Sequence, residues 1–401
     1  MTPTVELGSL VAPDAPICYG ILMPGADKEG GVPVVKVRNY DHSGIDVGQL
    51  LRVAPDIEAP YRRSRLKPGD ILMSIRGTTG VIAVVPPELS GANITQDTAR
   101  IRVDTADRDY LYQVLHSPSV RKQIRLHTIG QAVKGINIGA VRRLQIPWPS
   151  EATRRLVARI LGDCDSQIRN LGLLSTAKRI FKRGLMQKLL SGKKRFLEYR
   201  ELPWKSSRLG DHVAVVTRRN TNGSIRVLTA SGEHGLVDQR RYFNRSVASA
   251  DLSRYYLLKN GEFAYNRSAM NGHPYGATKR LDALEEGALS TLYLCFAIID
   301  LRLDSDYLMH IFDSGVLNRQ LRPIVRVGGR AHGLLNVSDE DYFSINIPFP
   351  QIEEQRRIAY VLNELNRELN LLESLREQIE GQKRALLVRL LDSDLSVLTS
   401  S

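Results

Sequence analysis

The sequence predicts an α+β fold with two β-rich domains in tandem, each followed by a long helix. The first observation is an internal repeat: Ile146-Pro147-Trp148-Pro149 returns as Ile347-Pro348-Phe349-Pro350, and leucines at a heptad spacing follow both copies. The second is the composition of the segments before these motifs, where short β-branched runs alternate with Gly, Pro, Asn and Asp. Strand and helix signals are therefore segregated along the chain, as in α+β proteins.

The repeat extends beyond the proline motifs in both directions. Downstream residues match without a gap, and weaker matches lie upstream in the same order. Two copies are too few for a solenoid, so a tandem duplication is the better description. The matching pairs are Leu7-Gly8 with Leu209-Gly210, Gly69-Asp70-Ile71 with Gly261-Glu262-Phe263, Asp109-Tyr110-Leu111 with Asp306-Tyr307-Leu308, Asn137 with Asn336, Arg155 with Arg356, Leu161 with Leu362, Leu174 with Leu375, and Lys182-Arg183 with Lys383-Arg384.

Two long helices are expected at residues 150–195 and 351–395. Proline is accepted before and in the first turn of a helix but not in its interior, so each proline motif marks a helix start. In the second copy a heptad seam steps by alternating three and four residues, and the first copy keeps the same frame from Leu161 to Leu189. The second seam consists of Leu362, Leu365, Leu369, Leu372, Arg376, Ile379, Lys383, Leu386 and Leu390.

The charges of these two segments are complementary. Residues 121–195 contain 18 basic and three acidic residues, whereas residues 351–395 contain seven basic and nine acidic residues. Opposite charge favours pairing of the two helices with each other over pairing of each with itself.

The remaining segments, 1–149 and 196–350, are predicted to be the two β-rich domains. Each ends in a short helix before its proline motif, near residues 110–116 and 307–312. The strands are expected at residues 34–37, 71–75, 81–85, 99–103, 225–228 and 292–299.

Composition points to a partner of opposite charge. The 401 residues include 56 Lys and Arg against 43 Asp and Glu, a formal net charge of +13. A basic chain commonly binds a polyanion, and nucleic acid is the first expectation. No run approaches the roughly 18 apolar residues of a membrane helix, and no signal pattern opens the chain, so we expect a cytoplasmic protein without a membrane partner. Cys18, Cys164 and Cys295 are too scattered for a disulfide framework or zinc site.

The sequence contains no recognisable catalytic motif. It has no P-loop, no Asn/Asp-Pro-Pro-aromatic loop of adenine methyltransferases, no HExxH and no GxSxG. Asp56 and Glu58 follow Pro55, but no x-Lys completes a metal-nuclease pattern. We therefore expect a non-catalytic binding protein with no metal and no cofactor.

Taken in order, these motifs closely resemble the specificity subunit of type I restriction-modification systems over essentially the whole chain. The first helix ends in KRGLMQKLLSGKKRF, and the second opens with Ile352-Glu353-Glu354-Gln355-Arg356-Arg357-Ile358. Other supporting motifs are Lys67-Pro68-Gly69-Asp70-Ile71-Leu72, Leu202-Pro203-Trp204, Leu209-Gly210-Asp211, and Gly261-Glu262-Phe263-Ala264-Tyr265-Asn266-Arg267-Ser268.

The resemblance implies a subunit without activity of its own, whose two target-recognition domains each bind one half of a bipartite site in double-stranded DNA. It implies that the long helices pair antiparallel and act as a spacer. It also implies docking of two adenine-methylating modification subunits and, through them, of ATP-driven restriction subunits; S-adenosylmethionine, ATP and Mg²⁺ would belong to those partners. Because the two domains differ in sequence, the site is expected to be asymmetric. The first copy departs from the pattern, with Thr153 where the second has Glu354, so equivalent docking of both modification subunits is not implied.

Candidate DNA contacts lie in polar, glycine-containing segments. Arg, Asn and Gln are suited to bidentate contacts with base edges, and Arg218, Arg219, Arg240 and Arg241 are better suited to phosphates. The basic residues of segment 178–195 could follow phosphates or could form a solvated helix face, with Lys178 and Lys182 pairing with the opposite helix. The base-contact candidates are Arg76, Asn93, Gln96, Asn266, Arg267, Asn271, His273 and Tyr275.

One alternative stays open from the sequence alone. A two-headed coiled-coil scaffold that binds only proteins would show the same duplication and the same long helices. Absence of DNA binding by the assembled complex at low salt would favour the scaffold.

Overall fold

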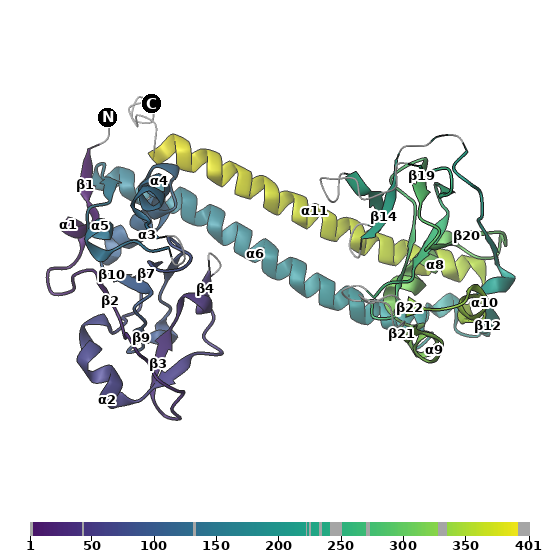
Figure 1. Ribbon diagram of the computed structural model, residues 1–401, viewed down its shortest axis with the longest axis horizontal. Coiled ribbons are helices and arrows are strands. Elements are labelled where there is room, and N and C mark those ends of the chain that lie inside the picture. Colours follow the sequence, from purple (N-terminus) through teal and green to yellow (C-terminus); the bar gives the residue numbers. More distant parts are fainter. Residues whose placement is uncertain are drawn as a thin grey trace. The chain divides into compact units, whose positions relative to one another are not determined.

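The computed structural model describes residues 3–41, 44–130, 134–221, 223, 226–231, 235–240, 251–269, 273–327 and 335–391. The chain divides into two compact units: unit 1 comprises Met1–Leu174 and Leu372–Ser401, and unit 2 comprises Ser175–Leu371. The long helices α6 (Glu151–Leu190) and α11 (Ile352–Leu391) each contribute one part to unit 1 and the other part to unit 2 (Figure 1).

Unit 1 is built on a four-stranded antiparallel sheet in the order β2-β10-β7-β8. A three-stranded sheet in the order β6-β3-β9 and the pairs β1-β11 and β4-β5 complete its strands. The strands are β1 (Thr4–Glu6), β2 (Cys18–Tyr19), β3 (Val32–Val35), β4 (Tyr40–Asp41), β5 (Gly44–Ile45), β6 (Leu51–Val53), β7 (Ile71–Ser74), β8 (Ile82–Val84), β9 (Asn93–Ile94), β10 (Thr98–Ile101) and β11 (Gln145–Pro147). The short helices are α1 (Leu7–Leu10), α2 (Pro55–Glu58), α3 (Thr105–Leu115), α4 (Pro118–His127) and α5 (Ile138–Arg142).

Unit 2 repeats this plan with a four-stranded antiparallel sheet in the order β13-β20-β17-β18. Its other strands form the pairs β12-β23, β14-β15, β16-β19 and β21-β22. The strands are β12 (Lys205–Arg208), β13 (Val213–Val215), β14 (Leu228–Ser231), β15 (Gly235–Asp238), β16 (Tyr256–Lys259), β17 (Phe263–Asn266), β18 (Ala277–Arg280), β19 (Glu286–Leu289), β20 (Leu294–Ile298), β21 (Arg326–Val327), β22 (Leu335–Asn336) and β23 (Asn346–Phe349). The short helices are α8 (Ser305–Ser314), α9 (Asn318–Ile324) and α10 (Asp339–Phe343).

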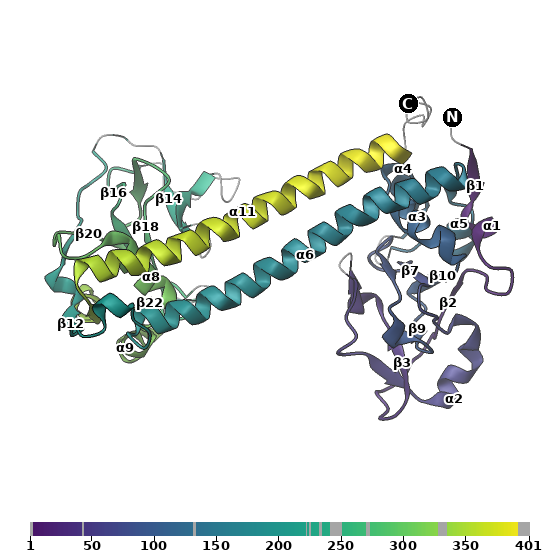
Figure 2. The ribbon, with the colours of Figure 1, turned by 180° about the vertical axis from the view of Figure 1, so that it is seen from behind.

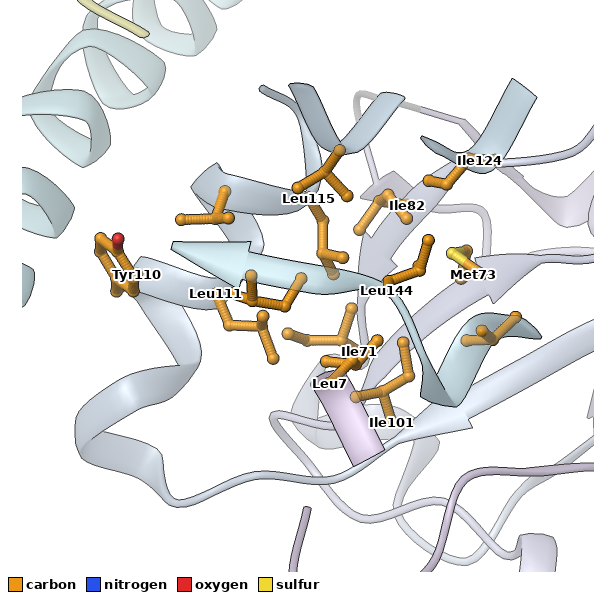
Figure 3. Close-up of a cluster of buried hydrophobic side chains, with 14 of the residues drawn as sticks. Leu7, Ile71, Met73, Ile82, Ile101, Tyr110, Leu111, Leu115, Ile124 and Leu144 are labelled. Atoms are coloured by element: carbon orange, nitrogen blue, oxygen red, sulfur yellow. The ribbon is translucent and has the colours of Figure 1, made fainter. Parts of the chain in front are cut away.

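Both faces of each four-stranded sheet are buried. In β7, Ile71 and Met73 face the larger core of unit 1, whereas Leu72 faces a second core. Figure 3 shows the larger core, with Ile71, Met73 and Ile82 of the sheet and Tyr110 and Leu111 of α3. Since successive strand side chains point to opposite faces, a sheet covered on both sides reads as a continuous apolar run. Strand β17 repeats the alternation, with Phe263 and Tyr265 in one core and Ala264 in the other.

The Ile-Pro-aromatic-Pro motif joins each domain to its long helix. Ile146 and Ile347 are fully buried at equivalent positions of β11 and β23. The Tyr110 hydroxyl donates to the Pro147 carbonyl at 2.8 Å, and the Tyr307 hydroxyl donates to the Pro348 carbonyl at 3.2 Å. The duplication predicted from sequence is therefore confirmed in strand order and in individual hydrogen bonds.

Within each unit the two long helices run antiparallel. In unit 1, Leu161 of α6 shares a core with Leu390 of α11, and Lys383 lies 2.5 Å from Asp165. In unit 2, the later residues of α6 meet the earlier residues of α11: Lys178 lies 2.6 Å from Glu368, and Leu189 shares a core with Leu362. The view from behind in Figure 2 shows the same pairing. The predicted fold class is confirmed. The Lys178–Glu368 pair follows the predicted charge complementarity, whereas the Lys383–Asp165 pair has the opposite polarity.

Two local features depart from the repeat or from the expected strands. Asn137 caps α5 by accepting the Ala140 N–H at 2.8 Å, but the equivalent cap of α10 is Ser338, which accepts from Asp341 at 3.0 Å. Asn336 instead pairs with Arg326 at the end of a two-stranded sheet. The strand expected at 225–228 begins only at Leu228 and continues to Ser231; Ile225 lies outside the described residues.

Candidate nucleic-acid interface

In unit 1 the structure brings Arg76 and Gln96 to the same end of the central sheet. The register pairs Ser74 with Thr98, and the Ile75 N–H continues this ladder by donating to the Asp97 carbonyl at 2.8 Å. Arg76 and Gln96 come next on the two strands. Arg76 is exposed and Gln96 is partly buried, so both remain candidates for contact with DNA.

Asn93 lies in the interior, where its side chain is fully engaged. Its amide donates to Glu58 at 2.9 Å and to the Tyr61 carbonyl at 3.0 Å, and its oxygen accepts from the Ser64 hydroxyl at 2.7 Å. Glu58 is buried and pairs with Arg65, whose hydrogen bond lowers the pKa of the Glu58 carboxyl. Asn93 therefore holds the α2 region on the sheet. A direct base contact of Asn93 would require this network to open.

In unit 2 the base-contact candidates gather around the connection between β17 and β18. Asn266 ends β17 opposite Ala277, and Arg267 pairs with Asp339 of α10. The Nε of Arg267 is buried and has no partner among the described residues. Tyr275 accepts at its carbonyl from Tyr265, 2.7 Å away. His273 lies in the same connection, and burial, followed by the nearby Lys279, lowers the pKa of its imidazole.

This connection is the counterpart of the segment that carries Arg76. Strands β7 and β8 of unit 1 occupy the same sheet positions as β17 and β18 of unit 2. Arg76 of unit 1 and the candidates Arg267, His273 and Tyr275 of unit 2 thus fall on equivalent connections, whereas Gln96 lies between β9 and β10. Asn271 and Arg241 lie outside the described residues.

The arginines proposed to contact phosphates differ in whether a neighbouring carboxylate already neutralises their charge. Arg218 lies 3.0 Å from Glu262, whose hydrogen bond raises the pKa of the arginine. Arg219 lies over the Tyr256 ring at 4.8 Å. Arg240 is exposed just after β15. The carboxylate of Glu262 would repel a phosphate at Arg218. Arg219 and Arg240 are therefore the better phosphate candidates of this group.

Part of the basic segment 178–195 serves the protein itself. Lys178 pairs with Glu368 on the opposite helix. Arg195 makes two hydrogen bonds to the buried Glu354, at 3.0 and 2.7 Å, and the Trp204 indole donates to the same carboxylate at 2.8 Å. This network was not anticipated from the sequence, because Glu354 lies 159 residues from Arg195 and 150 residues from Trp204 along the chain.

The described residues offer no obvious catalytic centre. They contain no group of three or more His, Cys, Asp or Glu residues that could hold a metal ion. His212 is buried, bonded to Asp300 and Ser207 and stacked on Phe349 at 4.3 Å, which is a packing role. None of the described helices has both the length and the apolar composition needed to cross a membrane.

Unit 2 also contains a polar cavity of about 280 Å³ beside α8, lined by Lys279, Arg280, Asp306, His310, Asp313 and Asn363, among others. His310 is buried and bonds Asn363 at 2.8 Å. Burial lowers the pKa of His310, and Lys182 acts in the same direction, against the hydrogen bond to Asn363 and the carboxylates of Asp313 and Asp306.

We expect unit 2 to lose stability as the pH falls through 6.5. The unfolded chain takes up a proton on His310 near its ordinary pKa of 6.5, whereas the folded chain does not until a lower pH. Urea unfolding followed by Trp204 fluorescence in a Trp148→Phe background, between about pH 7.5 and 5.5, measures this loss. His310→Gln should reduce the pH dependence of the free energy of unfolding. The pH dependence that remains is assigned to His273, whose pKa is also lowered. An unchanged pH dependence in His310→Gln would contradict this account.

Comparisons with known proteins agree with the geometry. No protein-family model matches the chain. The type I restriction enzyme EcoBI specificity subunit of Escherichia coli is 27% identical over 157 residues, which cover 38% of this chain and 33% of the relative. The chain therefore matches about a third of that relative's length. A putative type I restriction enzyme MjaX specificity subunit of Methanocaldococcus jannaschii is 22% identical, covering 92% of this chain and 88% of the relative.

The fold is also shared with a solved structure. The type I restriction-modification system S subunit from M. genitalium superposes with a TM-score of 0.57 at 13% identity, covering 98% of this chain and 96% of that one. The chain is thus similar in sequence to specificity subunits of type I restriction-modification systems, and it shares the fold of a solved S subunit.

Proposed function

We propose that this protein is the DNA sequence-specificity subunit of a type I restriction-modification complex, and that its two domains bind the two halves of a bipartite, asymmetric site. One observation carries the proposal. The two units have the same sheet order, but the connection between their equivalent strands carries different side chains. Arg76 stands on that connection in unit 1, whereas Arg267, His273 and Tyr275 stand on it in unit 2. Different donors and acceptors at equivalent positions select different bases.

The paired helices are the proposed spacer and docking surface. Both units leave large apolar side chains of these helices exposed, with Leu173 66% exposed in unit 1 and Phe181 60% exposed in unit 2. Exposed apolar groups of this size favour a protein partner. The proposed partners are two modification subunits and, through them, the restriction subunits. The chain itself supplies no catalytic group and no cofactor to the complex.

Base contacts and phosphate contacts are assigned to different residues. Arg76, Gln96, Asn266 and Arg267 are the proposed base contacts in the described part of the chain. Arg219 and Arg240 are the proposed phosphate contacts of unit 2.

Methylation mapping tests the proposal. The protein is produced together with its modification subunit in cells that lack other adenine methylation, and methyladenine is mapped along the chromosome. The expected result is a gapped, asymmetric motif with a methyladenine in each half. Adenine methylation without sequence preference, or in an ungapped motif, would overturn it.

A further inference from the structure

One short helix is repeated in both units, and two of its basic positions are preserved. Helices α4 and α9 precede the last strand of their domains. In each, a glutamine side chain bonds the backbone of that strand in both directions: Gln123 with Gln145, and Gln320 with Asn346. These bonds fix the alignment of the two helices at an offset of 197 residues, the same as between Tyr110 and Tyr307.

The aligned positions separate into a buried face and a basic face. Ile124 and Leu321 occupy the same position and are buried in the cores of their units. Figure 3 shows Ile124 within the unit 1 core, near Met73 and Ile82. The neighbouring aligned positions are Lys122 with Arg319 and Arg125 with Arg322, and all four are exposed.

These four side chains have no ion-pair partner within the described ranges. Other arginines of the same domains are neutralised: Arg102 lies 2.6 Å from Asp70, and Arg280 lies 2.7 Å from Asp306. The chain has no Asp or Glu between Tyr110 and Ser150, and none between Ser314 and Ser338. A surface that keeps its positive charge and excludes acidic residues is suited to an anionic partner.

Helix α4 also contacts the connection that carries Arg76. Arg121 of α4 donates to the Gly80 carbonyl, and the hydroxyls of Thr79 and Thr128 lie 3.1 Å apart. Burial and the charge of Arg125 together lower the pKa of Arg121, as expected where positive charges are close. In unit 2 the Leu335 N–H donates to the Arg267 carbonyl at 2.8 Å, which ties the segment after α9 to the equivalent connection.

We propose that Lys122 and Arg125 on α4, and Arg319 and Arg322 on α9, are matching contacts of the two recognition domains to DNA phosphates. The inference rests on the proposed function, and it assigns phosphate contacts and base contacts to separate residues of each domain. Phosphate contacts carry no base information, so they can be kept alike in both copies while the adjacent connections diverge. None of these four residues stands out individually in the sequence. They share an offset of 197 residues and lie in segments without Asp or Glu, and this pattern identifies them together.

The test measures salt-dependent affinity of the complex assembled with its modification subunits, on a duplex that carries the mapped methylation motif. The variants are Lys122→Gln with Arg125→Gln, and Arg319→Gln with Arg322→Gln. Each phosphate contact contributes about 0.9 to the slope of log affinity against log salt, so each double variant should lower that slope by about 2 and weaken binding at least about tenfold at 0.1 M salt. The methylation motif should not change.

The matched control is Lys205→Gln with Arg208→Gln, which removes two exposed cations from β12 of unit 2. It should keep the wild-type slope. Unchanged urea midpoints show that the double variants are folded. A wild-type slope in both α4 and α9 variants, an equal loss in the control, or an altered motif would overturn the inference. Failure of the wild-type complex to prefer its motif over a scrambled duplex would instead overturn the proposed function.

Discussion

Replacement of Glu354 by alanine is expected to destabilise unit 2 by about 3 kcal/mol, because it leaves a largely buried guanidinium without its counter-charge. The Glu354 side chain is 1% exposed and that of Arg195 is 14% exposed. The carboxylate accepts two hydrogen bonds from Arg195 and one from the Trp204 indole. It therefore joins the start of α11 to the segment that follows α6. Urea unfolding followed by Trp204 fluorescence in the Trp148→Phe background measures the loss.

The double variant Arg195→Met with Glu354→Leu is the matched control. Replacement of a buried ion pair by apolar residues of similar volume is often close to neutral, so most of the lost stability should return. A Glu354→Ala midpoint equal to that of the parent would contradict the assigned role. Unit 1 is expected to be insensitive, because Thr153 occupies the matching position and Arg154 there stacks on Trp148 at 4.3 Å and pairs with Asp107 at 2.8 Å.

Truncation of the two equivalent helix leucines should destabilise two different units. Leu161 and Leu362 are both fully buried, the first in the core of unit 1 and the second in that of unit 2. Each change to alanine removes buried methyl groups and leaves a cavity, at a cost of about 3 kcal/mol. Trp148 reports on unit 1 and Trp204 on unit 2, so unfolding in single-tryptophan backgrounds assigns each loss.

The chain provides a pair of controls on the same helices. Leu174 and Leu375 are also equivalent in the repeat, but each is 45% exposed. Their change to alanine should cost well under about 1 kcal/mol, since little buried surface is removed. Equal losses in all four variants, or a loss from Leu161→Ala that registers equally at both tryptophans, would contradict the assignment of separate cores.

The parts of the fold that sequence predicted depend on local pattern. The heptad seam and the proline motifs are visible in consecutive residues, so α6 and α11 could be placed and their pairing inferred from charge. Lys178 is an example: its seam position and the acidic composition of the other helix predicted that it pairs with that helix, and the structure gives Glu368 as the partner. The sheet order was not predicted, but it is the same in the two units, as the repeat requires.

Long-range contacts account for what the sequence did not predict. Asn93 has a residue type suited to base edges, but Glu58, distant along the chain, binds it in the interior. Asn336 matched Asn137 by residue type, whereas the hydrogen bond identifies Ser338 as the equivalent cap. The bases that each connection selects also depend on DNA shape and deformation, which no residue list contains.

Exchange of one recognition domain tests the central claim most directly. Residues 1–149 are replaced by the corresponding domain of a specificity subunit with a different mapped half-site, and methyladenine is mapped for both proteins in complex with the modification subunit. If each domain binds its own half-site, one half of the motif changes while the other half and the gap length stay the same. A change in both halves, or in neither, would contradict the account.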